Sequence, residues 1–180
     1  VGGFDWFKFS AATSSSPTTA YRGTPAAVPG RIEAENFDEG GPSVAYYDTT
    51  PGNKGGSYRP TEDVDLGPTN DVGGGYYVGW TRAGEWLTYS VNVSTTGVYT
   101  LSTRVANIGL GASFHVEVDG VVASGRIDVP DTGAWDTWRT ISTTGVPLSA
   151  GAHVIRVVFD TIGSGGAVGG FNWFQLSSGT

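Results

Sequence analysis

Alternating apolar and polar residues with a period of two are the feature that most constrains the fold of this chain. The pattern runs through residues 86–93, 98–106 and 113–118, and no stretch shows a convincing helical period. Strict alternation is typical of strands with one buried face. Roughly ten short strands in a domain of this size favour two packed sheets. The sequence therefore predicts an all-β fold, a two-sheet antiparallel β-sandwich of the jelly-roll type.

The composition excludes several classes of function. The chain has 29 glycines, no cysteine and a net charge of −7, and charged residues make up 15% of it. Without cysteine there is no disulfide, thiol nucleophile or thiolate metal site, which suits the secreted, extracellular protein that we expect. The acidic balance argues against nucleic acid as a partner. No apolar run approaches the length of a membrane span, so we expect no membrane partner either.

A near-repeat indicates the domain organisation. Residues 1–10 (VGGFDWFKFS) return at 168–177 as VGGFNWFQLS, close to the end of the chain. The second copy would close a domain, so residues 1–9 are interpreted as the closing strand of a preceding module of the same kind. Residues 10–30 form a predicted Ser/Thr/Pro-rich linker, and residues 31–178 a complete domain. We therefore expect a monomeric chain carrying the second of two tandem modules, which often gain avidity by binding together.

Three tryptophans occupy positions where a core residue is not expected. Trp86 falls on the polar side of its alternating strand, Trp80 directly precedes a turn, and Trp135 lies in a turn-rich loop. Exposed aromatic rings usually contact a partner, and an indole face stacks well on the apolar C–H face of a sugar ring. The alternative is that a domain with few leucines builds its core from tryptophan.

Two glutamates lie close together in the segment 31–37 (RIEAENF). In a strand, Glu33 and Glu35 would share one face, where their like charges repel unless something compensates them. A Ca²⁺ ion is one solution, with Asn172 adding an oxygen ligand from the last strand. A catalytic carboxylate pair, as in glycosidases, is a second interpretation. Two solvated glutamates on an edge strand are the third.

Four segments together resemble carbohydrate-binding module family 6: 32–37 (IEAENF), 73–93 (GGGYYVGWTRAGEWLTYSVNV), 132–138 (TGAWDTW) and 169–176 (GGFNWFQL). This family is non-catalytic, has a β-sandwich fold and is attached to polysaccharide-degrading enzymes. The resemblance implies a structural Ca²⁺, for which Glu33, Glu35 and Asn172 match the side-chain ligands. A backbone carbonyl near Ser57 would complete the ligand set.

The resemblance also implies where a sugar binds. Trp80 and Trp135 match the two aromatics that sandwich a sugar in the principal cleft at one end of the sandwich. Glu85 and Trp86 match the Gly-acidic-Trp motif of a second cleft on one sheet face.

This sequence departs from the family pattern at two positions of the principal cleft. It has Gly170 where many members place an asparagine that hydrogen-bonds the sugar, and Gly67 at a position that is often acidic. Asp65 or Glu62 would have to replace the missing carboxylate.

The expected function is therefore to bind a polysaccharide or oligosaccharide and to target a covalently linked glycoside hydrolase to it. The segment 46–65 resembles modules of laminarinases and agarases, which suggests a β-1,3-glucan of the laminarin type or a marine galactan such as agarose. Two alternatives are a glycoside hydrolase that uses paired carboxylates and a spacer or adhesion domain without a ligand.

Overall fold

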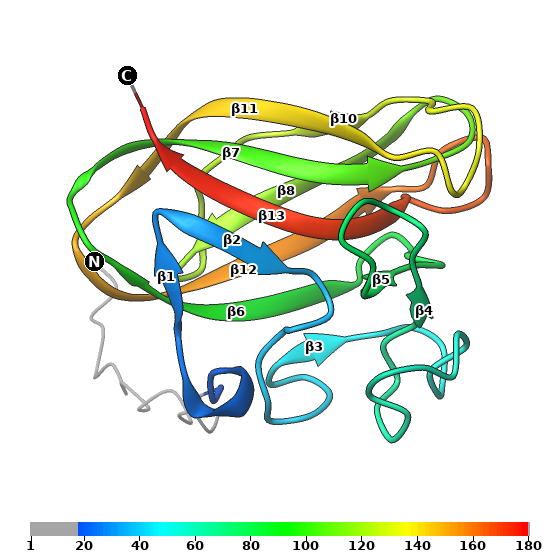
Figure 1. Cartoon of the computed structure of the whole chain (residues 1–180), viewed down its shortest axis with the longest axis horizontal. Coiled ribbons are helices and arrows are strands. Elements are labelled where there is room, and N and C mark those ends of the chain that lie inside the picture. Colours follow the sequence, from blue (N-terminus) through cyan, green and yellow to red (C-terminus); the bar gives the residue numbers. More distant parts are fainter. Residues whose placement is uncertain (1–17, 180) are drawn as a thin grey trace, which may run out of the picture.

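The computed structural model describes residues 18–179, which form two β-sheets packed face to face (Figure 1). The first sheet has the strand order β1-β6-β12-β8-β10, with β3 added beside β6 and β9 beside β8. Its strands are β1 (Ala26–Val28), β3 (Tyr46–Tyr47), β6 (Trp86–Val93), β8 (Ala112–Val118), β9 (Val121–Val122), β10 (Ile127–Val129) and β12 (Gly151–Thr161).

The second sheet has the order β11-β7-β13-β5-β4, with β2 added beside β13. Its strands are β2 (Gly30–Glu33), β4 (Leu66–Pro68), β5 (Tyr76–Val78), β7 (Gly97–Ala106), β11 (Arg139–Leu148) and β13 (Gly170–Ser178). The all-β, two-sheet sandwich is confirmed, and the three alternating segments are the strands β6, β7 and β8. All pairings are antiparallel in the described residues except β1 with β6, which is parallel.

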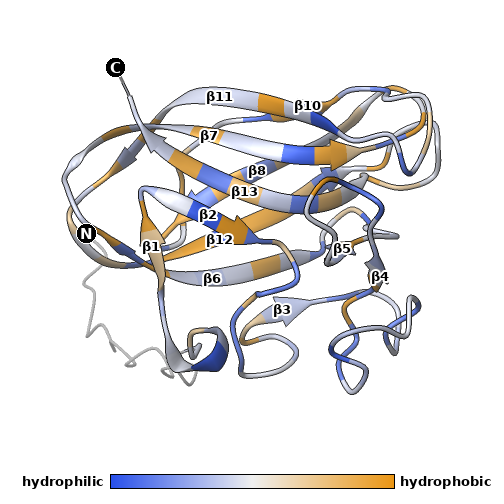
Figure 2. Cartoon of the chain, viewed as in Figure 1, coloured by the Kyte–Doolittle hydropathy of each residue, from blue (hydrophilic) through white to orange (hydrophobic). Residues whose placement is uncertain are grey.

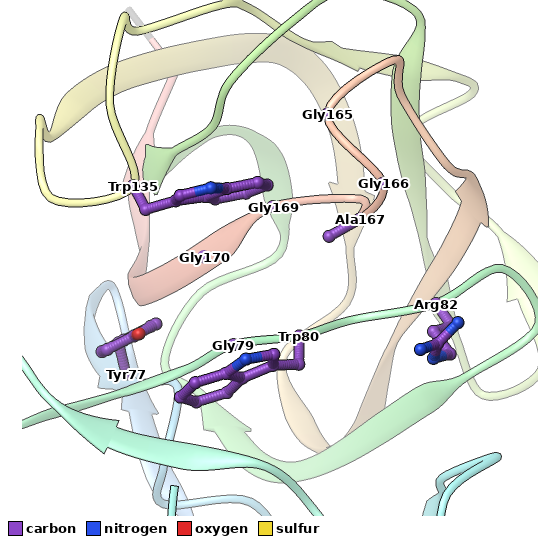
Figure 3. A pocket seen from close by; sticks show the side chains of 10 residues that line it. All are labelled: Tyr77, Gly79, Trp80, Arg82, Trp135, Gly165, Gly166, Ala167, Gly169 and Gly170. Carbon is purple, nitrogen blue, oxygen red and sulfur yellow. The ribbon is translucent and has the colours of Figure 1, made fainter. Parts of the chain in front are cut away.

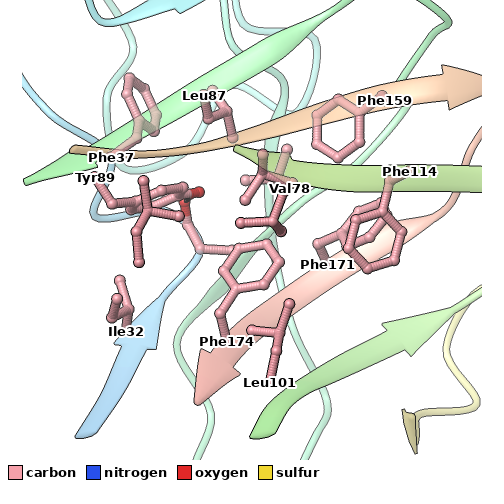
Figure 4. Close-up of a cluster of buried hydrophobic side chains, with 14 of the residues drawn as sticks. Ile32, Phe37, Val78, Leu87, Tyr89, Leu101, Phe114, Phe159, Phe171 and Phe174 are labelled. Carbon is pink, nitrogen blue, oxygen red and sulfur yellow. Dashed lines mark hydrogen bonds between the residues drawn. The ribbon is translucent and has the colours of Figure 1, made fainter. Parts of the chain in front are cut away.

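Aromatic rings fill much of the space between the sheets (Figure 4). Phe114 and Phe171 meet edge to face, with ring centroids 5.2 Å apart, and Phe159 lies 4.9 Å from Phe171. Figure 2 shows hydrophobic and hydrophilic positions in turn along the strands. Since each inward side chain is followed by an outward one, the period of two in the sequence decides which residues enter this core.

The segment before β2 belongs to the fold, which corrects the predicted linker. The described part of that linker, residues 18–30, contains β1, and Val28 is only 1% exposed because it is buried between the sheets. The Thr18 hydroxyl also donates a hydrogen bond to Asp38 (3.0 Å). The segments 1–9 and 10–17, predicted as a leftover strand and the first part of the linker, lie outside the described residues.

Long loops meet at the end of the sandwich where β5 leads into β6, on the right in Figure 1. The loops 130–138 and 162–169 lie at the same end, and the Val168 amide donates to the Thr81 carbonyl (2.9 Å). The Thr81 hydroxyl then donates to the Gly169 carbonyl (2.7 Å). These bonds hold the start of β13 against the β5–β6 connection. Within residues 18–179 no helix is long and apolar enough to cross a membrane.

Candidate functional site

A cleft of about 320 Å³ opens at this end of the sandwich (Figure 3). It is lined by Tyr77, Gly79, Trp80, Arg82, Trp135, Gly165, Gly166, Ala167, Gly169 and Gly170. Three aromatic side chains and five glycines among these residues make a surface that is mostly carbon and backbone. Such a surface suits a ligand that is bound through its apolar faces.

Trp80 and Trp135 stand on opposite walls of the cleft, with open space between their rings (Figure 3). Their side chains remain 41% and 40% exposed, so neither is a core residue. Trp80 has a backbone φ of +50°, which is uncommon for a large residue and turns the chain sharply after β5. The structure thus brings together the two tryptophans that the sequence predicts for the principal cleft.

The loop that carries Trp135 is fixed by hydrogen bonds behind the ring. The Thr132 hydroxyl donates to the Asn107 carbonyl (2.9 Å) and accepts from the Asn107 amide (2.8 Å). The position of Trp135 therefore follows from the β7–β8 connection as well as from its own loop. A rigid support of this kind keeps the two walls apart before a ligand enters.

The polar residues expected for this cleft are engaged elsewhere. Asp65 is 3% exposed and accepts a hydrogen bond from the Lys54 amide (2.5 Å), and burial raises the pKa of its carboxyl group. Glu62 forms an ion pair with Arg59 (2.7 Å). Neither carboxylate is among the described residues that line the cleft, whereas Gly170 is. The cleft therefore has fewer polar side chains than the sequence led us to expect.

The second predicted cleft has its tryptophan on a sheet face, but its glutamate is buried. Trp86 is half-buried on the outer side of β6, and the Arg156 guanidinium lies 5.3 Å from its ring centroid. Glu85 is 5% exposed and accepts hydrogen bonds from the Thr49 hydroxyl (2.6 Å) and the Arg82 amide (2.7 Å). The Glu85 carboxylate therefore ties two loops together behind the face that Trp86 presents.

Glu33 and Glu35 do not share a strand face, contrary to the expectation from their spacing. β2 ends at Glu33, whose carboxylate forms an exposed ion pair with Arg31 (2.9 Å). Glu35 lies in the turn that follows and is only 6% exposed. The Asn36 amide donates to the Glu33 carbonyl (3.0 Å) and closes this turn, while the Ala34 amide donates to the Asn172 carbonyl (3.0 Å) and anchors the turn to β13.

Two buried oxygen atoms near this turn lack a hydrogen-bond partner among the described residues: Glu35 Oε2 and Asn172 Oδ1. Burial, together with the nearby negative charge of Glu33, raises the pKa of Glu35 to about 7. Unpaired buried oxygens are costly and call for an explanation such as an ion. Their chemistry, one carboxylate and one amide oxygen, fits a hard cation such as Ca²⁺.

The remaining expected ligand, Ser57, is bound within its own loop. Its carbonyl accepts a hydrogen bond from Asn53 (2.8 Å), and its hydroxyl donates to the Gly55 carbonyl (3.2 Å). Nowhere in residues 18–179 do three or more His, Cys, Asp or Glu side chains gather as a metal site.

A partly buried ion pair holds Asn172 from the other side. The Asn172 amide group donates to Asp71 (2.8 Å), and Asp71 pairs with Arg104 (2.7 Å). The hydrogen bonds from Arg104 lower the pKa of Asp71 to about 2, so this carboxylate is ionised at neutral pH. Because the amide nitrogen of Asn172 is engaged here, its oxygen must point away from Asp71.

Sequence reasoning missed Tyr77 as a residue of the cleft. Its ring stacks on Trp80, with centroids 6.2 Å apart, and it meets Trp138 edge to face at 5.4 Å. The available signal was the alternation in β5, where the buried Val78 places Tyr77 on the opposite face.

Comparisons with known proteins identify the family and support the fold. Residues 54–178 match the model of the carbohydrate binding module, family 6. The chain belongs to carbohydrate-binding module family 6. Modules of this family are non-catalytic sugar-binding domains of glycoside hydrolases.

Two solved family 6 modules are similar over nearly their whole length. One belongs to lichenase 5A of Cellvibrio mixtus and was solved with cellotriose; it is 32% identical, with a TM-score of 0.63, over 85% of this chain and 99% of that one. The other is the C-terminal module of a marine laminarinase from Zobellia galactanivorans, 26% identical with a TM-score of 0.62, over 82% and 98%.

Curated relatives are much longer than the matched segment. The clotting factor G alpha subunit of Tachypleus tridentatus is 31% identical over 123 residues, which are 67% of this chain and 17% of that protein. This chain therefore matches only a small part of that protein's length.

Proposed function

We propose that this family 6 module binds a β-glucan, with β-1,3-linked laminarin as the leading ligand, and targets an attached, secreted glycoside hydrolase to it. The observation that supports this is the pair of exposed indoles, Trp80 and Trp135, on opposite walls of one cleft. Two aromatic walls bind a pyranose that has C–H groups on both faces. Rings of glucose in β-glucans meet this condition because their hydroxyl groups are equatorial.

Agarose is the second candidate because its galactose units carry one axial hydroxyl group. That hydroxyl would put a polar group over one indole, where burial without a partner costs free energy. The similarity to the lichenase module solved with cellotriose also favours a β-glucan.

The hydrolase alternative lacks a suitable carboxylate pair, since Glu33 is tied to Arg31 and Glu35 is buried in a turn. A glycosidase pair must flank the scissile bond. A ligand-free spacer would leave two exposed tryptophans without a role.

The deciding experiment is Trp135→Ala. We expect the wild-type chain to be retarded in gels that contain laminarin, and the variant to run as in a gel without polysaccharide. The unfolding temperature should change little, because Trp135 is 40% exposed and leaves no large cavity. Isothermal titration should give a wild-type dissociation constant of roughly micromolar to millimolar, as expected for a flexible glycan on a small surface.

Trp86→Ala is compared with Trp135→Ala in the same laminarin gels. Gels that contain agarose, xylan or barley β-glucan are compared with the laminarin gel for the wild-type chain. Retained binding in Trp86→Ala would assign the ligand to the end of the sandwich, and the reverse result would assign it to the outer face of β6. Normal binding by Trp135→Ala would contradict the proposal, and a wild-type chain that binds no polysaccharide would favour the spacer.

We also propose a structural Ca²⁺ held by Glu35 and Asn172, with Glu33 available from its exposed ion pair. The two unpaired buried oxygens and the raised pKa of Glu35 support this assignment. When bound, the ion would balance the negative charge of the buried Glu35 carboxylate. Glu35 and Asn172 would then link the turn after β2 to β13, while Asp71 keeps Asn172 in place.

A further inference from the structure

We infer that Tyr77 forms the floor of the cleft and contacts the bound sugar, so that Tyr77 helps to decide which sugars the cleft accepts. The inference rests on the proposed function, because it assigns a third residue to the cleft of Trp80 and Trp135. The role of Tyr77 is argued from the packing around its ring.

The direction of Tyr77 follows from strand β5. Val78 is 2% exposed and points between the sheets, so the preceding residue points to the outer side. There the Tyr77 ring is nearly parallel to Trp80, with an angle of 22° between the planes, and it meets Trp138 at 72°. Figure 3 shows the Tyr77 ring beside Trp80, at the same end of the cleft as Gly170 and below Trp135.

Glycines surround the Tyr77 ring and leave room for it. Gly67 faces Tyr77 directly across the β4–β5 pair, and a Cβ atom there would lie 2.9 Å from the ring. A Cβ at Gly79 would lie 2.6 Å from the ring, and one at Gly170 would lie 3.2 Å from it. Contacts of this length are too close for carbon atoms, which prefer about 3.5–4.0 Å. The ring therefore lies directly on backbone at all three positions.

This packing explains the two departures in the sequence. A side chain at position 67 would overlap the Tyr77 ring, and one at position 170 would have to displace the ring by a few tenths of an ångström. Glycine at both positions therefore leaves the floor aromatic, with no polar side chain from either position. Trp138 completes this arrangement, because its indole nitrogen donates to Asn70 (3.0 Å) and its ring edge supports Tyr77 from behind.

The hydroxyl of Tyr77 is the polar group that remains. It forms no hydrogen bond with the described residues, and burial alone raises the pKa of the phenol. The hydroxyl is therefore protonated at neutral pH and free to exchange a hydrogen bond with a sugar hydroxyl. Arg82 also lines the cleft, but Figure 3 places it away from Tyr77, on the far side of Trp80.

The consequence is selectivity for neutral sugars with few polar groups at the edge that enters the cleft. A sugar hydroxyl that is buried without a hydrogen-bond partner weakens binding. Because the floor offers a single hydroxyl group, a sugar edge with several buried hydroxyl groups should bind more weakly. Glucose and galactose carry the same number of hydroxyl groups and differ in the orientation of the one at C4, so the floor would favour laminarin over agarose where the axial C4 hydroxyl of galactose meets the apolar ring. Selectivity would then depend on Tyr77 as well as on the two indoles.

The test compares Tyr77→Ala, Tyr77→Leu, Tyr77→Phe and Trp135→Ala by isothermal titration with laminarin and by agarose-gel retardation, with unfolding temperatures measured for each. We expect Tyr77→Ala to bind laminarin at least about tenfold more weakly, since an aromatic contact and a hydrogen bond are lost. Tyr77→Leu keeps apolar contact with the glycines and should fold, with a similar loss of affinity. Tyr77→Phe should lose roughly fivefold from the missing hydroxyl alone.

A double variant tests the packing independently of the ligand's identity. Gly170→Asn should weaken laminarin binding and lower the unfolding temperature in the wild-type chain, because its Cβ would press on the Tyr77 ring. In the Tyr77→Ala background the same change should be tolerated, with an unfolding temperature at or above that of Tyr77→Ala alone. Val121→Ala, which removes a 69% exposed side chain at the distant β8–β9 hairpin, is the control.

The outcomes separate this inference from the proposed function. Loss of binding in Trp135→Ala with normal binding in Tyr77→Ala or Tyr77→Leu would overturn the role of Tyr77 alone. Unchanged affinity in Tyr77→Phe would overturn the hydroxyl contact, and additive effects of the double variant would overturn the packing argument. Normal binding in Trp135→Ala would instead overturn the proposed cleft, and this inference with it.

Discussion

At the scale of single residues, two places carry features that bear on the proposed ligand and ion. Trp80 combines an exposed indole with a left-handed backbone, and it stands opposite Trp135. Glu35 combines burial with an unpaired oxygen, and so does Asn172. Each feature costs stability in the free chain. Costs of this kind are commonly found where a protein meets a ligand or an ion.

The calcium proposal predicts how stability depends on pH. Burial raises the pKa of Glu35 from 4.5 to about 7, so the folded chain without metal binds this proton more tightly than the unfolded chain does. The contribution of Glu35 to the stability of the metal-free chain is then largest below pH 4.5 and is lost as the pH rises to about 7. Ca²⁺ requires the ionised carboxylate, so stabilisation by the ion should increase over the same range.

Thermal unfolding with and without a chelator measures this effect. At pH 7.5, Ca²⁺ at about one hundred times its dissociation constant should add about 2.7 kcal/mol, which is about 5–10 °C for a chain of this size. Glu35→Gln should remove most of the response to Ca²⁺ and flatten the dependence on pH. A chain that unfolds at the same temperature with Ca²⁺ and with chelator would contradict the assignment.

At the scale of elements, the added strand β1 shows that the domain begins before the point expected from composition. β1 pairs in parallel with β6, the strand that ends next to the Ser94 loop, and the Ser94 amide donates to the Val28 carbonyl (2.8 Å). The strand covers an edge of the first sheet that would otherwise present unpaired backbone groups. The Ser/Thr/Pro-rich composition around β1 is typical of a linker, so the sequence did not predict this strand.

Substitution of Val28 tests the contribution of β1. Val28→Ala should lower the free energy of unfolding by about 2 kcal/mol, because a fully buried side chain loses its contacts. Val98→Ala, at a side chain that is 57% exposed, should change it by no more than about 0.5 kcal/mol. Urea unfolding measures both. Equal effects of the two substitutions would mean that β1 is dispensable.

At the scale of the whole molecule, the sandwich acts as a rigid frame for one set of loops. The β5–β6 connection, the loop before β11 and the loop before β13 meet at one end and form the cleft. The walls depend on hydrogen bonds between residues far apart in the sequence, such as that between Thr81 and Gly169. A shallow cleft of this kind binds one short segment of glycan, so the affinity of a single module is limited.

Joining modules should therefore strengthen binding to a polymer. Two copies of residues 18–179 on a flexible linker should bind laminarin at least about tenfold more tightly than one copy, through effective concentration alone. A short laminarin oligosaccharide that reaches one cleft should show no such gain. Trp135→Ala in one of the two copies should return the affinity for the polymer to that of a single module, and titration calorimetry measures all three.

The sequence alone determined the sandwich, because alternation in β6, β7 and β8 fixes which side chains face the core. It also indicated the exposed tryptophans, since Trp80 and Trp135 lie at turns where no strand buries them. These signals are local. They can be read from the sequence without knowing which segments pack against one another.

Only the tertiary structure decided which loops meet and which groups they bury. The turn that separates Glu33 from Glu35 is anchored by a hydrogen bond between Ala34 and Asn172, which lies more than a hundred residues away. The floor of the cleft arises because Gly67 and Gly170 approach Tyr77 from two other strands. Contacts between segments far apart in the chain leave no periodic trace in the sequence, so their geometry becomes visible only when the two sheets are assembled.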